Sequence, residues 1–143
     1  MTTIRFEILG PPIGEGRPRA VRMGPLGVRM HAAPKSAEWR ALAAKQMSSE
    51  HKGQVPVDVP LAVTIEAVMP RPKSIPKRAG TGRVYRACKP DVDNVAKACL
   101  DALVQGGVIS DDRQVVSLVV RKETAAVGET PRAILTVARV GAA

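Results

Sequence analysis

Aromatic side chains are scarce in this 143-residue chain, which contains only Phe6, Trp39 and Tyr85. Proteins that bind single-stranded nucleic acid, or that use an RRM-like surface, stack bases on aromatic residues, so the composition disfavours both classes. Hydrophobic residues make up 45% of the chain, much of it alanine and valine. This content suffices for one domain, residues 1–143, with a thin core that is compatible with further burial at a subunit interface.

Cysteine and histidine are equally sparse. Cys88 and Cys99 form no CxxC pair, and His31 and His51 lie far from both thiols in the sequence. The ligand spacing of a zinc site is therefore absent. Because a disulfide is not expected in a reducing compartment, we predict two free thiols, with Cys99 packed as a small core residue.

Long apolar runs are absent as well. No segment approaches the roughly 20 residues that span a bilayer, and the opening MTTIRFEILG lacks the charged-then-apolar order of a signal peptide. The GxGxxG-like segments near Gly14 and Gly80 do not open helices, so they do not match a nucleotide-binding loop. The sequence predicts a cytoplasmic protein with no membrane partner and no nucleotide cofactor.

Basic residues are abundant and unevenly distributed. The formal net charge is +9, and residues 1–90 hold 16 Lys and Arg against 6 Asp and Glu, whereas residues 91–143 hold 6 against 7. The electrostatic field of such a positively charged protein attracts polyanions, above all nucleic acid. Segment 70–90 carries seven Lys and Arg and no acid, with Pro76, Gly80 and Gly82 as breakers. We expect it to be a mobile loop that contacts phosphates.

Hydrophobic periodicity predicts more strands than helices. Strands are expected at residues 3–9, 61–69, 114–120 and 133–140, with GPLG turning a short hairpin inside the glycine- and proline-rich segment 10–30. One helix is expected to start at the N-cap Ser36, and a second to run from Asp91 or Asp93 to about Gln105. The second helix should bury the apolar stripe Val95, Ala98, Cys99, Ala102 and Leu103. The pattern indicates an α+β fold, a single domain with a mixed β-sheet and helices packed against one face.

The acidic residues of the second half are concentrated in KPDVDNVAKACLDALVQGGVISDDRQVV, residues 89–116. One carboxylate suffices to cap a helix and one to make a turn, so neither Asp91 with Asp93 nor Asp111 with Asp112 is explained by local structure. If Asp112 returns to the helix start, three carboxylates converge, as in sites that bind Mg²⁺ together with water and phosphate. Such a metal supports phosphodiester hydrolysis, and the basic surface would deliver the DNA.

Lys97 lies between two of these aspartates, because Asp93, Lys97 and Asp101 recur at four-residue intervals along one helix face. The spacing alone leaves two interpretations open. The residues form surface ion pairs worth a few tenths of a kcal/mol each, or the lysine stabilises charge on a phosphoryl group one turn from the metal.

The motif DVDNVAKACLDAL followed by ISDDRQVV resembles the signature of the RusA family of Holliday junction resolvases. That signature is Asp-x-Asp-Asn-x-x-Lys, then Leu/Phe-Asp-Ala/Gly-Leu, then Asp-Asp-x-Gln-Val. The segments GEGRPRAVR and MPRPKS are also similar to those of family members, although the resemblance is specific only across residues 90–116. It implies a small homodimeric endonuclease, often encoded by phages or prophages. Such enzymes bind four-way DNA junctions and cut two strands of like polarity with Mg²⁺, for which Mn²⁺ can substitute.

Carried over by position, the resemblance implies that Asp91, Asp93 and Asp112 are metal ligands and that Lys97 is a catalytic lysine. Asn94 and Asp101 match motif positions with a supporting role, and Asp111 is expected to serve the turn. Some family members have an arginine immediately before the first aspartate. That position is Pro90 here, so no role of that arginine is carried over.

Contacts to the DNA backbone are expected from basic residues of the two proline-containing loops, since phosphate contacts position DNA without reading its bases. The candidates are Arg17, Arg19, Arg22, Arg71, Lys73, Lys77 and Arg78. Two rival functions remain at this point. One is a non-catalytic DNA-binding protein whose aspartates serve as caps and turns, and the other is a metal-dependent nuclease that acts on other branched DNA.

Overall fold

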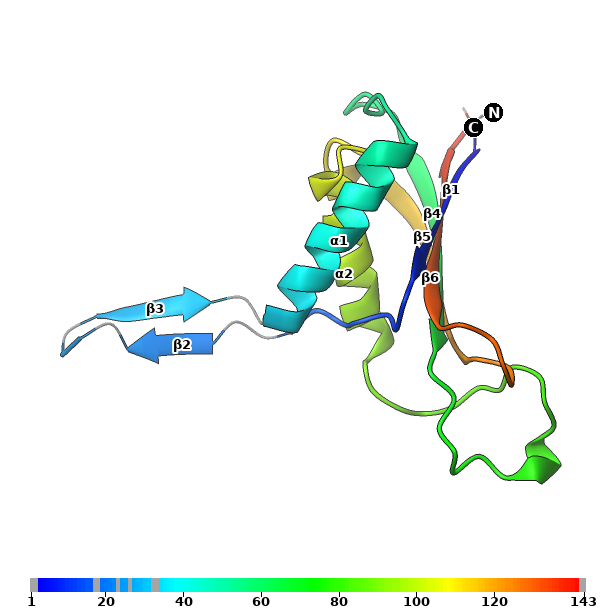
Figure 1. The fold of residues 1–143 in the computed structure, drawn as a ribbon. Helices are drawn as coiled ribbons and strands as arrows, with labels where there is room; N and C mark the ends of the chain where they lie inside the picture. Colours follow the sequence, from blue (N-terminus) through cyan, green and yellow to red (C-terminus); the bar gives the residue numbers. More distant parts are fainter. Residues whose placement is uncertain (1–2, 17–18, 23, 26, 32–33, 142–143) are drawn as a thin grey trace.

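The computed structural model describes residues 3–16, 19–22, 24–25, 27–31 and 34–141, which form the strands and helices of Figure 1. The strands are β1 (Thr3–Leu9), β2 (Arg19–Arg22), β3 (Val28–His31), β4 (Leu61–Met69), β5 (Val115–Thr124) and β6 (Arg132–Arg139). The α-helices are α1 (Pro34–Glu50) and α2 (Val92–Gln105), and the 3₁₀ turns are η1 (Lys77–Ala79) and η2 (Asp112–Gln114).

Four strands build one mixed sheet in the order β1-β6-β4-β5. Strand β6 is antiparallel to both β1 and β4, whereas β4 and β5 are parallel. A parallel pair needs a long crossover, and the loop after β4 together with α2 supplies it. Both helices lie against the same face of the sheet (Figure 1). The predicted α+β architecture, with 61–69 as an interior strand and a short hairpin within 10–30, is confirmed.

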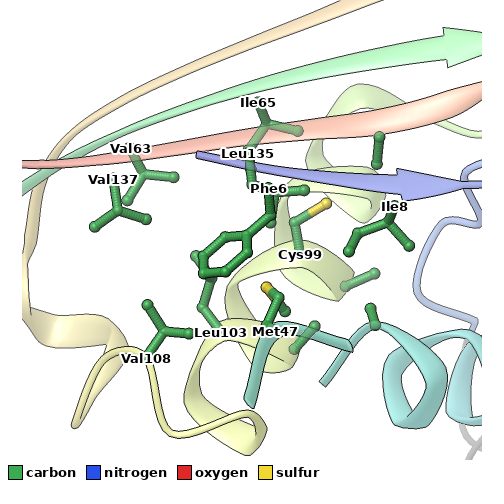
Figure 2. Packing of buried hydrophobic residues seen from close by; sticks show 14 of the residues in the cluster. Phe6, Ile8, Met47, Val63, Ile65, Cys99, Leu103, Val108, Leu135 and Val137 are labelled. Carbon is green, nitrogen blue, oxygen red and sulfur yellow. The ribbon is translucent and has the colours of Figure 1, made fainter. Parts of the chain in front are cut away.

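The core lies between this sheet face and the two helices, with Met47 of α1 and Leu103 of α2 both buried in it (Figure 2). The stripe predicted on α2 is buried throughout, each residue being at most 1% exposed. It meets Phe6 and Ile8 of β1, Ile65 of β4 and Leu135 of β6. Burial raises the pKa of the Cys99 thiol to about 12, so this cysteine stays protonated and packs as an apolar residue, as predicted.

Two boundaries differ from the sequence prediction by more than one residue, each for an identifiable reason. Helix α1 begins at Pro34, two residues before the expected cap Ser36; proline is favoured at a first helical position because it has no N–H to satisfy. The Ser36 hydroxyl instead accepts a hydrogen bond from the Gly16 N–H at 3.4 Å. Strand β5 continues four residues beyond Val120 to Thr124, because its backbone stays paired with β4 as far as Met69. Lys122 and Glu123 also find partners on distant segments.

The basic segment 70–90 has no regular element except η1 within the described residues, as expected of a loop. The Arg71 guanidinium donates hydrogen bonds to the carbonyl oxygens of Gly80 and Gly82, both at 2.8 Å, and of Ala125 at 3.2 Å. Val84 pairs with Thr124 at the end of β5. These contacts fasten a segment that the sequence predicted to be mobile.

Arg83 ties the same loop to the turn before β6. Its guanidinium donates to both carboxylate oxygens of Glu129, at 2.6 to 3.1 Å, and lies 3.6 Å from Glu123. The hydrogen bonds from Arg83, and then that from the Ala126 N–H, lower the pKa of Glu129 to about 2. The bidentate geometry makes this pair stronger than an ordinary surface ion pair.

Glu129 should therefore make the protein sensitive to acid. Its pKa is about 2 when folded and near 4.5 when unfolded, so the stabilisation is present above pH 4.5 and is lost as the pH falls toward 2. We expect wild-type stability to fall more steeply over this range than that of Glu129→Gln, measured by urea unfolding at fixed pH. The exposed Glu38→Gln serves as control, and equal slopes for wild type and Glu129→Gln would contradict the assignment.

In the described part of the chain, no helix has the length and apolar character required to cross a membrane.

Candidate active site

Helix α2 presents the first two aspartates of the motif. Asp91 occupies the N-cap position, yet its side chain makes no capping hydrogen bond. Asp93 lies in the first turn and accepts a hydrogen bond from the Asn94 N–H at 3.0 Å. Both carboxylates are exposed. The interpretation of Asp91 as a structural cap is thus not supported, and its charge is available for a ligand.

The two aspartates of the second pair, Asp111 and Asp112, differ in their contacts. Asp111 caps η2, accepting from the Arg113 N–H at 2.9 Å, and this hydrogen bond is the main cause of its lowered pKa. Asp112 is exposed. The turn is anchored by buried Gln114, whose side chain donates to the carbonyl oxygens of Pro56 at 2.6 Å and Val59 at 3.1 Å. Asp111 therefore serves the turn, as expected, and Gln114 holds the turn that presents Asp112.

A hollow between α2 and β5, about 520 Å³ in volume, collects most of the predicted residues. It is lined by Asp93, Lys97, Asp101 and Asp112 together with apolar residues of α2 and β5. Asp91 lines an adjoining hollow of about 730 Å³, together with Asp93, Arg86 and Lys89. Asp93 is the aspartate common to both. The structure therefore brings Asp93, Lys97 and Asp112 together and places Asp91 on the neighbouring side of Asp93.

The three predicted metal ligands do not form one compact cluster. Within the described residues no group of three His, Cys, Asp or Glu side chains is placed to hold a metal ion, because Asp91 and Asp112 lie in different hollows on either side of Asp93. Mg²⁺ nevertheless needs only one or two carboxylates, with waters and substrate phosphate completing its shell. Exposed carboxylates suit such a hard cation, and Asp93 is the aspartate that lines both hollows.

Lys97 belongs to a chain of charges that ends on α1. Its Nζ lies 3.6 Å from Asp101 Oδ2, which is 3.5 Å from Arg40 Nη1. That same nitrogen is 2.8 Å from both carboxylate oxygens of Glu15. The side chain of Lys97 is 63% exposed, against 19% for Arg40 and 11% for Glu15. Asp101 thus links Lys97 to Arg40 and, through Arg40, to Glu15, two residues that the sequence did not reveal.

A second lysine holds the segment that leads into Asp91. Lys122 Nζ on β5 donates to the carbonyl oxygen of Cys88 and, at 2.8 Å, to that of Pro90. The sequence around Lys122 does not reveal that it holds this segment, because both acceptors lie more than 30 residues earlier in the chain.

The residues predicted to contact DNA differ in their location and exposure. Arg17 lies outside the described residues, and Arg19 and Arg22 are on β2, in the hairpin that extends away from the helices (Figure 1). Lys73, Lys77 and Arg78 are exposed. Arg71 is half-buried, with its guanidinium bonded to loop carbonyls. The sequence reasoning missed Arg86, Lys35 and Lys89 as candidates, although all three line hollows that also contain Asp91.

Comparison with known proteins supports the family assignment that the motif suggested. A family model described as "Endodeoxyribonuclease RusA" matches residues 10–138, nearly the whole chain. The protein named "Uncharacterized protein YqaN" from Bacillus subtilis (strain 168) is 33% identical over 129 residues, which cover 85% of this chain and 88% of that relative. The family match includes both helices and the strands that follow β1, so it extends well beyond the aspartate motif. The chain therefore belongs to the RusA family of endodeoxyribonucleases.

Proposed function

We propose that this protein is a Mg²⁺-dependent endonuclease that resolves four-way DNA junctions during recombination and repair. Its family makes it an endodeoxyribonuclease. The observation that carries the proposal is the hollow that Asp93 and Asp112 share with Lys97. Exposed carboxylates beside a cation, on a basic protein, are what metal-assisted phosphodiester hydrolysis requires.

The polar and charged residues in and around this hollow have distinct roles in the proposed reaction. Asp93, with Asp91 or Asp112, would hold Mg²⁺, which when bound polarises the phosphate and lowers the pKa of a bound water. Lys97 Nζ would stabilise the negative charge that grows on the phosphoryl oxygens. Its long 3.6 Å contact with Asp101 leaves its donors free for that purpose. Lys122 and Gln114 keep the two aspartate-bearing segments in place.

The basic surface would bring DNA to these carboxylates, which repel phosphate unless a cation is bound. Exposed Lys73, Lys77 and Arg78 would contact the backbone, joined by the arginines of the hairpin segment, Arg17, Arg19 and Arg22. Contacts of this kind give affinity that depends strongly on salt and carries no sequence information.

A homodimer is part of the proposal, because two paired nicks need two active sites. A two-fold axis suits a junction whose arms are themselves related by two-fold symmetry. Support comes from β5, which is an edge strand of the sheet and exposes Val116 and Val119. A second copy covering this strand would bury apolar side chains that otherwise face water. A cytoplasmic location remains a prediction.

The test is cleavage of a synthetic four-way junction labelled on each strand in turn. We expect nicks at symmetric positions on two strands of like polarity, and sedimentation at twice the 15.2 kDa mass of the chain. Flap or three-way substrates cut in preference to the junction would instead favour a nuclease for other branched DNA. Binding without any cutting would favour the non-catalytic alternative.

A further inference from the structure

A third hollow, about 870 Å³ in volume, lies beside Asp91 and has no role in the reaction described above. It is formed by the loop after β1, the first turn of α1 and the turn that leads into α2. Its polar lining consists of Glu15, Lys35, Lys89, Asp91 and Asn94, together with the backbone of Gly14 and Gly16.

The glycine-containing wall of this hollow is packed directly on the motif. The Glu15 N–H donates to the Asn94 carbonyl oxygen at 2.9 Å. A Cβ atom on Gly14 would lie 2.6 Å from Pro90 Cβ and 3.2 Å from Asn94 Cβ, closer than side chains approach one another. The hollow is therefore a built feature whose shape depends on the same residues that lead into Asp91.

The charge of the hollow favours an anion. Lys35 and Lys89 are both exposed, and neither has an ion-pair partner among the residues that the structure describes. The one acid in the opposite wall, Glu15, is neutralised by Arg40 at 2.8 Å. Asp91 is the remaining carboxylate, and a metal ion on Asp91 would remove its repulsion.

The three hollows form a continuous path past the start of α2. The lysine-lined hollow shares Lys89 and Asp91 with the middle one, which contains Arg86. The middle hollow shares Val92 and Asp93 with the one that contains Lys97 and Asp112. A DNA strand whose scissile phosphate lies at Asp93 would therefore pass a neighbouring phosphate over Lys35 and Lys89.

We propose that this hollow binds one backbone phosphate of the cleaved strand, next to the scissile one, through Lys35 and Lys89. The inference rests on the proposed function and adds a specific contact to it. Holding a second phosphate fixes the strand relative to the aspartates, so that the reacting phosphate is positioned before hydrolysis. Asn94 can add its side-chain amide as a neutral donor.

The experiment measures junction binding by Lys35→Gln and Lys89→Gln, with Lys45→Gln as control because it removes an exposed lysine from the same helix α1. We expect each of the first two variants to bind about tenfold more weakly and to lower the salt dependence by about one counterion. Lys45→Gln should bind as wild type.

Junctions with a single neutral methylphosphonate, moved along the cleaved strand, then locate the contact. Wild type should lose affinity at one position beside the cut, and the double variant Lys35→Gln/Lys89→Gln should lose little further there, because both partners of that phosphate have already been removed. Unchanged binding by both variants, or equal losses at every methylphosphonate position, would overturn this inference while leaving junction cleavage by wild type intact. A wild-type protein that neither binds nor cuts junctions would instead overturn the proposed function.

Discussion

Replacing Asp93 by Asn is expected to lower junction cleavage by on the order of 10³-fold or more while junction binding persists or tightens. Asp93 is the aspartate that lines both hollows of the candidate site, so either pairing of metal ligands includes it. Asparagine keeps the shape of the side chain but removes the charge that holds a hard cation. Losing that charge also removes a source of repulsion toward DNA, which explains the retained binding.

The matched control is Asp58→Asn, which changes an exposed aspartate in the loop between α1 and β4. Cleavage rate, junction affinity and Mn²⁺ binding should be measured for wild type and both variants. Mn²⁺ binding is a readout that does not depend on catalysis, and it should be lost in Asp93→Asn alone. Cleavage by Asp93→Asn at the wild-type rate would remove the assignment of the metal site.

Replacing Lys97 by Gln should lower kcat by about 10²-fold or more, the typical cost of removing one donor to a developing negative charge. Junction affinity should change little, because a single exposed lysine contributes only a small part of a phosphate-dominated affinity. Stability should change by less than about 0.5 kcal/mol, as for other exposed ion pairs. The variant therefore separates the two interpretations that helical spacing left open.

The informative comparison is with Arg121→Gln, which removes an exposed cation from β5. Single-turnover cleavage gives the chemical step, and urea unfolding gives the stability of each variant. If Lys97→Gln cuts at the wild-type rate and is only slightly destabilised, the lysine is a surface ion-pair partner of Asp101 and has no catalytic role.

Elements with a strong local pattern could be predicted from the sequence. Strand β1 alternates in polarity over Thr3–Leu9, and α2 repeats its apolar residues at helical spacing, so short-range periodicity determined both. Elements that depend on distant partners were predicted less well. Strand β5 ends in charged residues beyond the predicted apolar run, and its backbone pairing with β4 as far as Met69 explains why the strand continues to Thr124.

In the candidate site, too, the residues with a local sequence pattern could be predicted, and those that depend on distant contacts could not. The motif spacing placed Lys97 and Asp93 on one helix face, and the structure adds that Asp112 lines the same hollow. The residues that hold this arrangement were invisible, because Glu15 and Arg40 are 25 residues apart and Gln114 reaches a carbonyl 58 residues away. A sequence pattern reveals side chains that carry chemistry, whereas their supports depend on which segments the fold brings into contact.

The most direct test of the account compares cleavage of a four-way junction with cleavage of a linear duplex of the same sequence, each with and without Mg²⁺. We predict symmetric paired nicks in the junction with Mg²⁺, little cutting of the duplex, and none of either substrate once the metal is removed. Junction cleavage that persists without a divalent cation would contradict the metal site, and equal cutting of duplex and junction would contradict the junction-resolving function.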